Sequence, residues 1–214
     1  RYVHRGDGPD RLVWHRLFHE VQGCLGGGLA LGCASSQLSV EKYGDVGDSS
    51  WEDLCSLASD VVRKAIDAGV SLGTAESCTG GLVSAALTAV PGSSQVVYGG
   101  VASYALSVKH HVLGVSQDTL DTVGAVSAEC ATQMCLGASS VLGVDVAVSV
   151  TGIAGPGGAE PGKPVGTVWF GLQSPDGVRA VLRTFSGSRD QVRNKAVSVA
   201  LNLLLEAVEK RLVR

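Results

Sequence analysis

The chain has 214 residues, of which 45% are hydrophobic and 17% are charged, and its net charge is −3. This size and apolar content are sufficient for one well-buried domain. The acidic balance and the 5% aromatic content exclude the basic, aromatic-rich surface that is typical of nucleic-acid-binding proteins. No apolar segment reaches the ~18 residues that a membrane-spanning helix needs, so we expect no membrane contact.

The six cysteines are scattered through the chain, and none forms a C-x-x-C pair. No histidine lies at ligand spacing from them, so the sequence predicts no metal site. Scattered cysteines of this kind are typical of reduced thiols in a cytoplasmic protein.

Residues 1–49 show no sustained hydrophobic periodicity and begin with Arg. We expect them to form an N-terminal extension that is mobile or foreign to the natural product. A single domain is predicted over residues 50–214. It opens with a helix in which Ser50 is the N-cap and Gly69 ends the last turn.

The rest of the chain alternates between strand and helix patterns. Strands are predicted at 70–76, 95–104 and 144–152, followed by a hairpin of 166–173 and 178–185, with helices at 80–90, 105–114, 126–143 and 188–212. Ser127 and Ser188 are the expected N-caps of the two long helices. This order predicts an α/β fold, a single three-layer sandwich domain with helices on both faces of a mixed sheet.

The stretch TAESCTGG, residues 74–81, lies where a predicted strand gives way to a helix. Ser77 would lie near the free N–H groups of a helix that begins around Thr79–Gly81, and such groups can bind an anion or an oxyanion. On these eight residues alone, a helix cap is the better-supported interpretation, and a nucleophilic serine is the alternative. Cys78 is a weaker nucleophile, because apolar surroundings would raise its pKa.

A nucleophilic serine needs a base, and His110 and His111 adjoin Lys109 on a short predicted helix. A lysine can act as the base if burial lowers its pKa. Tyr104 lies about one helical turn before Lys109, so both could face one cleft. The alternative for Lys109 is an ordinary solvated lysine.

The segment VTGIAGPGGAEPGKPVGTVWFG, residues 150–171, follows an interior strand and is rich in glycine and proline. It matches neither the phosphate-binding P-loop nor the dinucleotide fingerprint. Its position after an interior strand is where α/β sheets bind ligands, so we expect a loop that folds over a polar ligand. A plain surface excursion is the alternative.

Five segments together resemble one family: TAESCTGGLVSAALTAVPGSS, YGGVASYALSVKHHVLGV, GAVSAECA, AVSVTGIAGPGG and KPVGTVWFGL. They are similar, in order and spacing, to the C-terminal domain of the competence/damage-inducible protein CinA, which also occurs as a stand-alone nicotinamide-nucleotide amidase. The resemblance covers roughly residues 50–214. It implies hydrolysis of the carboxamide of nicotinamide mononucleotide to nicotinate mononucleotide and ammonia, in pyridine-nucleotide salvage.

The resemblance also implies roles for individual residues. Ser77 would be the nucleophile, Lys109 a neutral base, and Tyr104 a proton relay or a group that orients the lysine. The oxyanion would be held by N–H groups around Cys78–Gly80, and Arg189 would bind the substrate phosphate. The substrate-binding set is then Glu76, Cys78, Thr79, Gly80, Gly81, Thr151, Gly152, Gly155, Pro156, Gly157 and Arg189.

The resemblance further implies an enzyme without metal or organic cofactor that forms a homo-oligomer and takes a small-molecule substrate. Two other functions stay open at this point. One is a nucleotide-binding or interaction module linked to competence or DNA damage, without turnover. The other is an amidase for a different carboxamide on the same scaffold.

Overall fold

The computed structural model describes residues 47–213, which belong to one compact unit. The prediction made for residues 1–49 therefore lies almost entirely outside the described residues. A five-stranded sheet of order β2-β1-β3-β4-β5 forms the centre. Its strands are β1 (Leu72–Glu76), β2 (Val97–Ala102), β3 (Val146–Gly152), β4 (Thr167–Ser174) and β5 (Gly177–Thr184). β1 pairs in parallel with β2 and β3, whereas β4 is antiparallel to β3 and β5.

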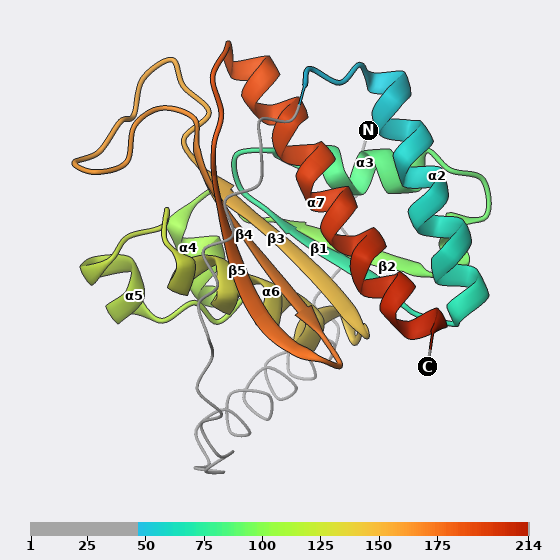
Figure 1. The fold of residues 1–214 in the computed structure, drawn as a ribbon. Coiled ribbons are helices and arrows are strands. Elements are labelled where there is room, and N and C mark those ends of the chain that lie inside the picture. The colour runs from blue at the N-terminus through green and yellow to red at the C-terminus, as the bar shows by residue number, and fades with distance from the viewer. Residues whose placement is uncertain (1–46, 214) are drawn as a thin grey trace, which may run out of the picture. The chain divides into compact units, whose positions relative to one another are not determined.

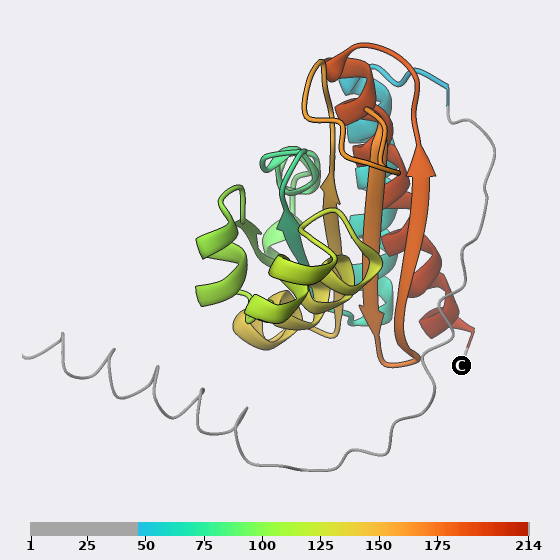
Figure 2. The same ribbon diagram turned by 90° about the vertical axis from the view of Figure 1, so that its left-hand side faces the viewer.

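Helices cover both faces of this sheet (Figures 1 and 2). Figure 1 shows α7 and α2 in front of the sheet and α6 behind it. The first layer contains α2 (Trp51–Ala68), α3 (Leu82–Thr88) and α7 (Arg189–Leu212), and the second contains α4 (Leu106–His111), α5 (Gln117–Thr122) and α6 (Ala128–Leu142). A short 3-10 helix, η1 (Ser93–Gln95), precedes β2. The predicted mixed sheet with helices on both faces is confirmed.

Each face of the sheet carries its own hydrophobic cluster. The larger cluster joins α2, α3 and α7 to the strands, and the smaller one packs α6 and the segment after α4 against them. The first six residues of β3 are buried, as expected for a strand that is apolar on both faces. The central strands are therefore fixed from both sides, and their ends are rigid points on which a site can be built.

The three long helices begin and end close to their predicted positions, whereas the short helices differ more from the prediction. Ser50, Ser127 and Ser188 cap their helices as predicted, and Gly69 ends α2 in the left-handed conformation. However, α3 begins only at Leu82, after a turn over residues 78–81. Helix α5 was not predicted, because its six residues are too few to show a hydrophobic period.

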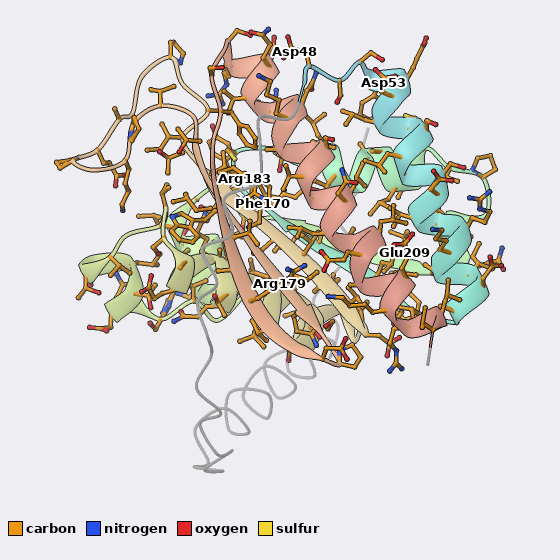
Figure 3. All side chains as sticks on the ribbon, viewed as in Figure 1. Asp48, Asp53, Phe170, Arg179, Arg183 and Glu209 are labelled. Atoms are coloured by element: carbon orange, nitrogen blue, oxygen red, sulfur yellow. The ribbon has the colours of Figure 1, made fainter. Side chains whose placement is uncertain are left out.

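Polar contacts hold α7 to its neighbours, and Figure 3 labels three of the residues that take part, Asp48, Arg179 and Glu209. Glu209 accepts a hydrogen bond from Lys64 of α2, and Arg179 of β5 lies 2.6 Å from a carboxylate oxygen of Glu206. At the other end of α7, Asp48 accepts a hydrogen bond from Gln191. No helix within residues 47–213 is both long enough and apolar enough to cross a bilayer.

Candidate active site

The candidate site lies at the edge of the sheet where β1, β2 and β3 all end. Because these strands are parallel, the residues that follow them meet at the same edge. Ser77 follows β1, Ser103 and Tyr104 follow β2, and the glycine-rich loop follows Gly152 at the end of β3. Since β4 runs antiparallel and β5 returns, α7 also begins here, with Arg189 as its first residue.

Ser77 is held by its backbone, and its side chain contacts Lys109. Its N–H donates to the carbonyl of Val150 over 2.8 Å, which extends the β1–β3 pairing by one residue. Its Oγ lies 2.9 Å from the Nζ of Lys109. The hydroxyl does not cap α3, so the helix-cap interpretation of Ser77 is wrong.

Lys109 is buried, with 1% of its surface exposed, so the interpretation as a solvated lysine is also wrong. Desolvation by this burial lowers the pKa of Lys109 below its ordinary 10.5, and the neighbouring thiols of Cys130 and Cys78 oppose the shift only in part. Nζ also donates to the carbonyl of Ser103. A neutral amine that gives one N–H to this carbonyl keeps its lone pair for the proton of Ser77.

The carboxylate of Glu76 binds the free N–H groups at the start of α3, which were predicted to bind an anion. Its carboxylate accepts hydrogen bonds from the N–H groups of Gly81 and Val83, both over 3.0 Å, and of Ser84 over 2.8 Å. These are the amides at the start of α3, so the helix mouth already holds an internal carboxylate. The Glu76 carboxylate and the Gly81 N–H, both assigned to substrate binding from the sequence, are hydrogen-bonded to each other in this arrangement.

The turn after Ser77 leaves two backbone donors for a developing oxyanion. The N–H of Gly80 donates to the carbonyl of Ser77 over 3.0 Å. It is therefore not available as one of the oxyanion-binding N–H groups that were predicted around Cys78–Gly80. Among residues 47–213, no hydrogen-bond acceptor is found for the N–H groups of Cys78 and Thr79. Burial raises the pKa of the Cys78 thiol to about 11, so this neighbour of Ser77 is a thiol at neutral pH.

Arg193 holds the same turn from α7, and sequence reasoning missed it. Its Nε donates to the carbonyl of Cys78 over 3.2 Å and its Nη2 to the carbonyl of Thr79 over 3.1 Å. The bound carbonyl of Cys78 shares its peptide unit with the N–H of Thr79, and that of Thr79 shares its unit with the N–H of Gly80, so Arg193 orients one of the two free donors directly and holds the rest of the turn. The available signal was its spacing, because Arg193 lies four residues after Arg189 and so shares its helix face.

Tyr104 and Arg189 are close to each other, and Tyr104 does not contact the lysine directly. Arg189 donates from Nη2 to the Tyr104 hydroxyl over 3.1 Å and from Nη1 to the carbonyl of Gly155 over 2.8 Å. Tyr104 is 64% exposed, whereas Lys109 is oriented by the Ser103 carbonyl. One guanidinium thus connects the segment after β2, the glycine-rich loop and the start of α7.

The remaining predicted residues line the loop with different roles. The Thr151 hydroxyl donates to the carbonyl of Ala125, which ties β3 to the segment before α6. Gly152 lacks space for a side chain, since a Cβ would lie 2.6 Å from the carbonyl oxygen of Thr167. Pro156, after a cis peptide bond, and Gly157 are exposed. Of the predicted loop residues, Pro156 and Gly157 are therefore the two that solvent reaches freely.

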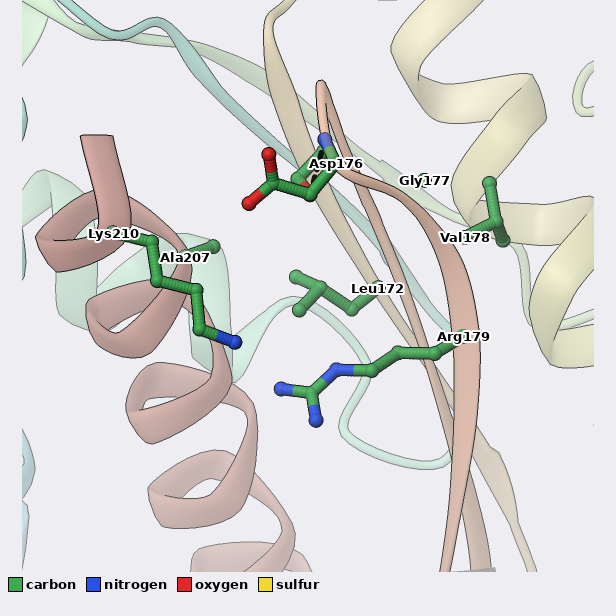
Figure 4. A pocket seen from close by; sticks show the side chains of 8 residues that line it. Leu172, Asp176, Gly177, Val178, Arg179, Ala207 and Lys210 are labelled. Carbon is green, nitrogen blue, oxygen red and sulfur yellow. Dashed lines mark hydrogen bonds between the residues drawn. The ribbon is translucent and has the colours of Figure 1, made fainter. Parts of the chain in front are cut away.

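We also searched the described part of the chain for a metal site and for other pockets. Residues 47–213 contain no cluster of three or more side chains suited to hold a metal ion. A pocket of about 230 Å³ lies between the β4–β5 turn and the end of α7, lined in part by Leu172, Arg179 and Lys210 (Figure 4). The strand register places it at the opposite edge of the sheet from Ser77.

These features define an α/β protein with a serine–lysine pair, whose lysine is buried, at the carboxyl edge of a mixed sheet. Residues 54–208 match the family model of the CinA C-terminal domain. The chain belongs to this family.

Known relatives support the same assignment. A CinA-like protein of Leptospira borgpetersenii is 45% identical over 71% of this chain, and the chain spans 36% of that protein's length. A protein of Enterobacter agglomerans named nicotinamide-nucleotide amidohydrolase PncC is 48% identical over 61% of this chain and 80% of its own length. The crystal structure of a CinA superfamily protein from Klebsiella pneumoniae superposes with a TM-score of 0.71 at 36% identity, covering 73% of this chain and 98% of that one.

Proposed function

We propose that this chain is an amidase that hydrolyses the carboxamide of nicotinamide mononucleotide to nicotinate mononucleotide and ammonia. The observation that carries the proposal is the 2.9 Å contact between the Ser77 hydroxyl and the desolvated amine of Lys109. A protein that only binds nucleotides has no need of an amine whose pKa is lowered beside a hydroxyl. The relative named as a nicotinamide-nucleotide amidohydrolase supports the choice of substrate.

The first half of the reaction transfers the acyl group to the serine. Lys109 takes the proton of Ser77 as Oγ attacks the carboxamide carbon, and the N–H groups of Cys78 and Thr79 bind the oxyanion. When the tetrahedral intermediate collapses, its C–N bond breaks. The ammonium of Lys109 returns the proton to the leaving nitrogen, so ammonia departs and an ester to Ser77 remains.

The second half hydrolyses this ester. Lys109, neutral again, takes a proton from water as the oxygen attacks the ester carbon, and Oγ leaves with that proton. The product is the carboxylate of the nicotinate nucleotide. Arg189, at the start of α7, supplies a guanidinium suited to the substrate phosphate, and substrate would then compete with its present contacts to Tyr104 and Gly155.

The test is ammonia release from nicotinamide mononucleotide, with Ser77→Ala as the control. We expect the substitution to lower kcat by at least ~10³ while the thermal unfolding midpoint stays close to that of the unchanged protein, since the hydroxyl caps no helix. A Lys109→Met variant should be equally inactive. Ammonia release no higher than that of the Ser77→Ala control would refute the proposal.

A second candidate is an amidase for another carboxamide, because the serine–lysine pair does not itself select the nucleotide. The exposed loop around Pro156 and Gly157 leaves the substrate side open. Nicotinamide, nicotinamide riboside and the mononucleotide, assayed in parallel, separate the two candidates. A preference for the phosphorylated compound that Arg189→Met removes would favour the first.

A further inference from the structure

The carboxylate of Glu76 is the most completely satisfied polar group near the site. Besides the three amides of α3, it accepts hydrogen bonds from the hydroxyl of Ser84 over 2.7 Å and from that of Thr74 over 3.3 Å. Its side chain is 1% exposed. The three N–H groups donate to Glu76, and the hydroxyls of Ser84 and Thr74, which also lie 2.6 Å from each other, supply their protons within the same cluster. A group that accepts on both oxygens therefore fits this position.

The structure makes room for this cluster at a specific place on the neighbouring strand. Gly100 of β2 faces the hydroxyls of Thr74 and Ser84, and a Cβ at this position would overlap both. Gly99, the next residue on the same strand, faces only the side chain of Leu142, at 3.2 Å. The cluster is therefore built from three elements, β1, β2 and α3, and tolerates no added atom.

The cap provided by Glu76 has a direct consequence for Ser77. The hydroxyl of a serine or threonine just before a helix ordinarily accepts a hydrogen bond from one of the first N–H groups of that helix. Here Gly81 is the N-cap residue and gives no side-chain cap, and neither hydroxyl of the turn is used in this way. The hydroxyl of Thr79 is buried without a hydrogen-bond partner among residues 47–213, and that of Ser77 contacts Lys109.

We propose that Glu76 is the positioning residue of the nucleophile. The Glu76 carboxylate, at the end of β1, accepts hydrogen bonds from the N–H groups at the start of α3, so these groups do not need the Ser77 hydroxyl. The same bonds fix the turn that directs the Ser77 hydroxyl toward Lys109. The inference rests on the proposed function only in taking Ser77 as the nucleophile. It does not depend on which carboxamide is hydrolysed.

A Glu76→Gln variant tests the role, because glutamine keeps the shape and replaces one acceptor by a donor. In either orientation its NH₂ group faces backbone N–H donors, so at least one buried amide loses its acceptor. We expect the turn to relax and Ser77 to move away from the amine. A displacement of about 1 Å is sufficient to lower the rate by up to about 10²-fold.

The readout that is independent of substrate is covalent labelling of Ser77 by diisopropyl fluorophosphate, followed by intact mass spectrometry. In this reaction the Oγ–P bond forms, fluoride leaves and Lys109 receives the proton. Glu76→Gln should lower the second-order labelling rate at least tenfold and leave its pH midpoint unchanged, since the amine itself stays in place. With nucleotide substrate, kcat should fall while KM changes less than twofold.

Two pairs of variants separate positioning from loss of stability. Val181→Ala removes core packing at a fully buried residue of β5 and should lower the unfolding midpoint without changing the labelling rate. Gly100→Ala should slow labelling as Glu76→Gln does, whereas Gly99→Ala should not. The Gly100→Ala and Gly99→Ala pair decides the matter if Glu76→Gln fails to fold.

The outcomes are distinct from those of the substrate assay. Fast labelling of the unchanged protein without ammonia release would remove the proposed substrate and leave the role of Glu76 intact. A folded Glu76→Gln variant labelled within twofold of the unchanged protein would overturn the positioning role. A shifted pH midpoint would overturn it as well, because Glu76 would then act through its charge on Lys109.

Discussion

The charge state of Lys109 can be measured without any substrate, through the pH dependence of stability. The perturbation is Lys109→Met, which keeps the bulk of the side chain and removes the titrating amine. In the unfolded chain this amine holds its proton up to about its ordinary pKa of 10.5, whereas burial lowers the pKa in the folded chain. Between the two pKa values, the unfolded state binds one proton more than the folded state.

The sign and size of the effect follow from this difference in bound protons. The free energy of unfolding of the unchanged protein should rise with pH by about 1.4 kcal/mol per unit in that window, relative to the variant. If the amine is neutral throughout the range from about pH 7 to about pH 9, the free energy of unfolding rises by about 2.7 kcal/mol over this range relative to that of the Lys109→Met variant. Below the folded pKa both states hold the proton, and the difference becomes constant.

The assay is urea unfolding of both proteins at several pH values below 9. This range avoids the thiols of Cys78 and Cys130, whose pKa values burial raises to about 11 from the ordinary 9.0. The unfolded-state ionisation of the thiols, which begins as the pH approaches 9, is common to both proteins and largely cancels in their difference. A difference between the two proteins that stays flat from neutral pH to pH 9 would mean that the folded amine keeps its proton, and the argument for Lys109 as the base would fail.

Three further results are expected. Because the reactive form of Lys109 is the deprotonated one, kcat/KM should rise with pH, level off above the lowered pKa of the amine, and reach its plateau below pH 10.5. Arg193→Met should reduce kcat about tenfold in steady-state assays, since the two loop carbonyls that the guanidinium holds are released, and Arg193→Lys should restore part of the loss. Gly137→Ala should lower the urea-unfolding free energy by about 1–3 kcal/mol, because a Cβ there would overlap the carbonyl of Leu113, whereas Gly157→Ala meets open space and should change it little.

Much of the fold was predictable because its signals are local. Ser50, Ser127 and Ser188 are short polar residues directly before apolar periodicity, and each caps its helix in the structure. The turn between β4 and β5 has the composition of a hairpin. In each case the residues that decide the geometry are neighbours in the sequence.

The site was predictable only in part, because its decisive contacts join distant residues. Glu76 caps α3 from the end of a strand, seven residues before Val83, and no capping rule searches for a glutamate there. Arg193 lies near the start of α7, and apart from its four-residue spacing from Arg189 its sequence context does not distinguish it from a solvated arginine. The contact of Lys109 with Ser77 followed from family resemblance, since neither residue has a local pattern that points to the other.

The hydrogen bond from Arg193 to the carbonyl of Cys78 joins two residues that are 115 positions apart in the sequence. During synthesis, the segment that contains the nucleophile leaves the ribosome well before the helix that braces it. A nascent chain therefore carries Ser77 for some time without the contacts that fix the turn after it. Because α7 is made after this segment, a product truncated before Arg193 lacks the contacts that hold the turn after Ser77.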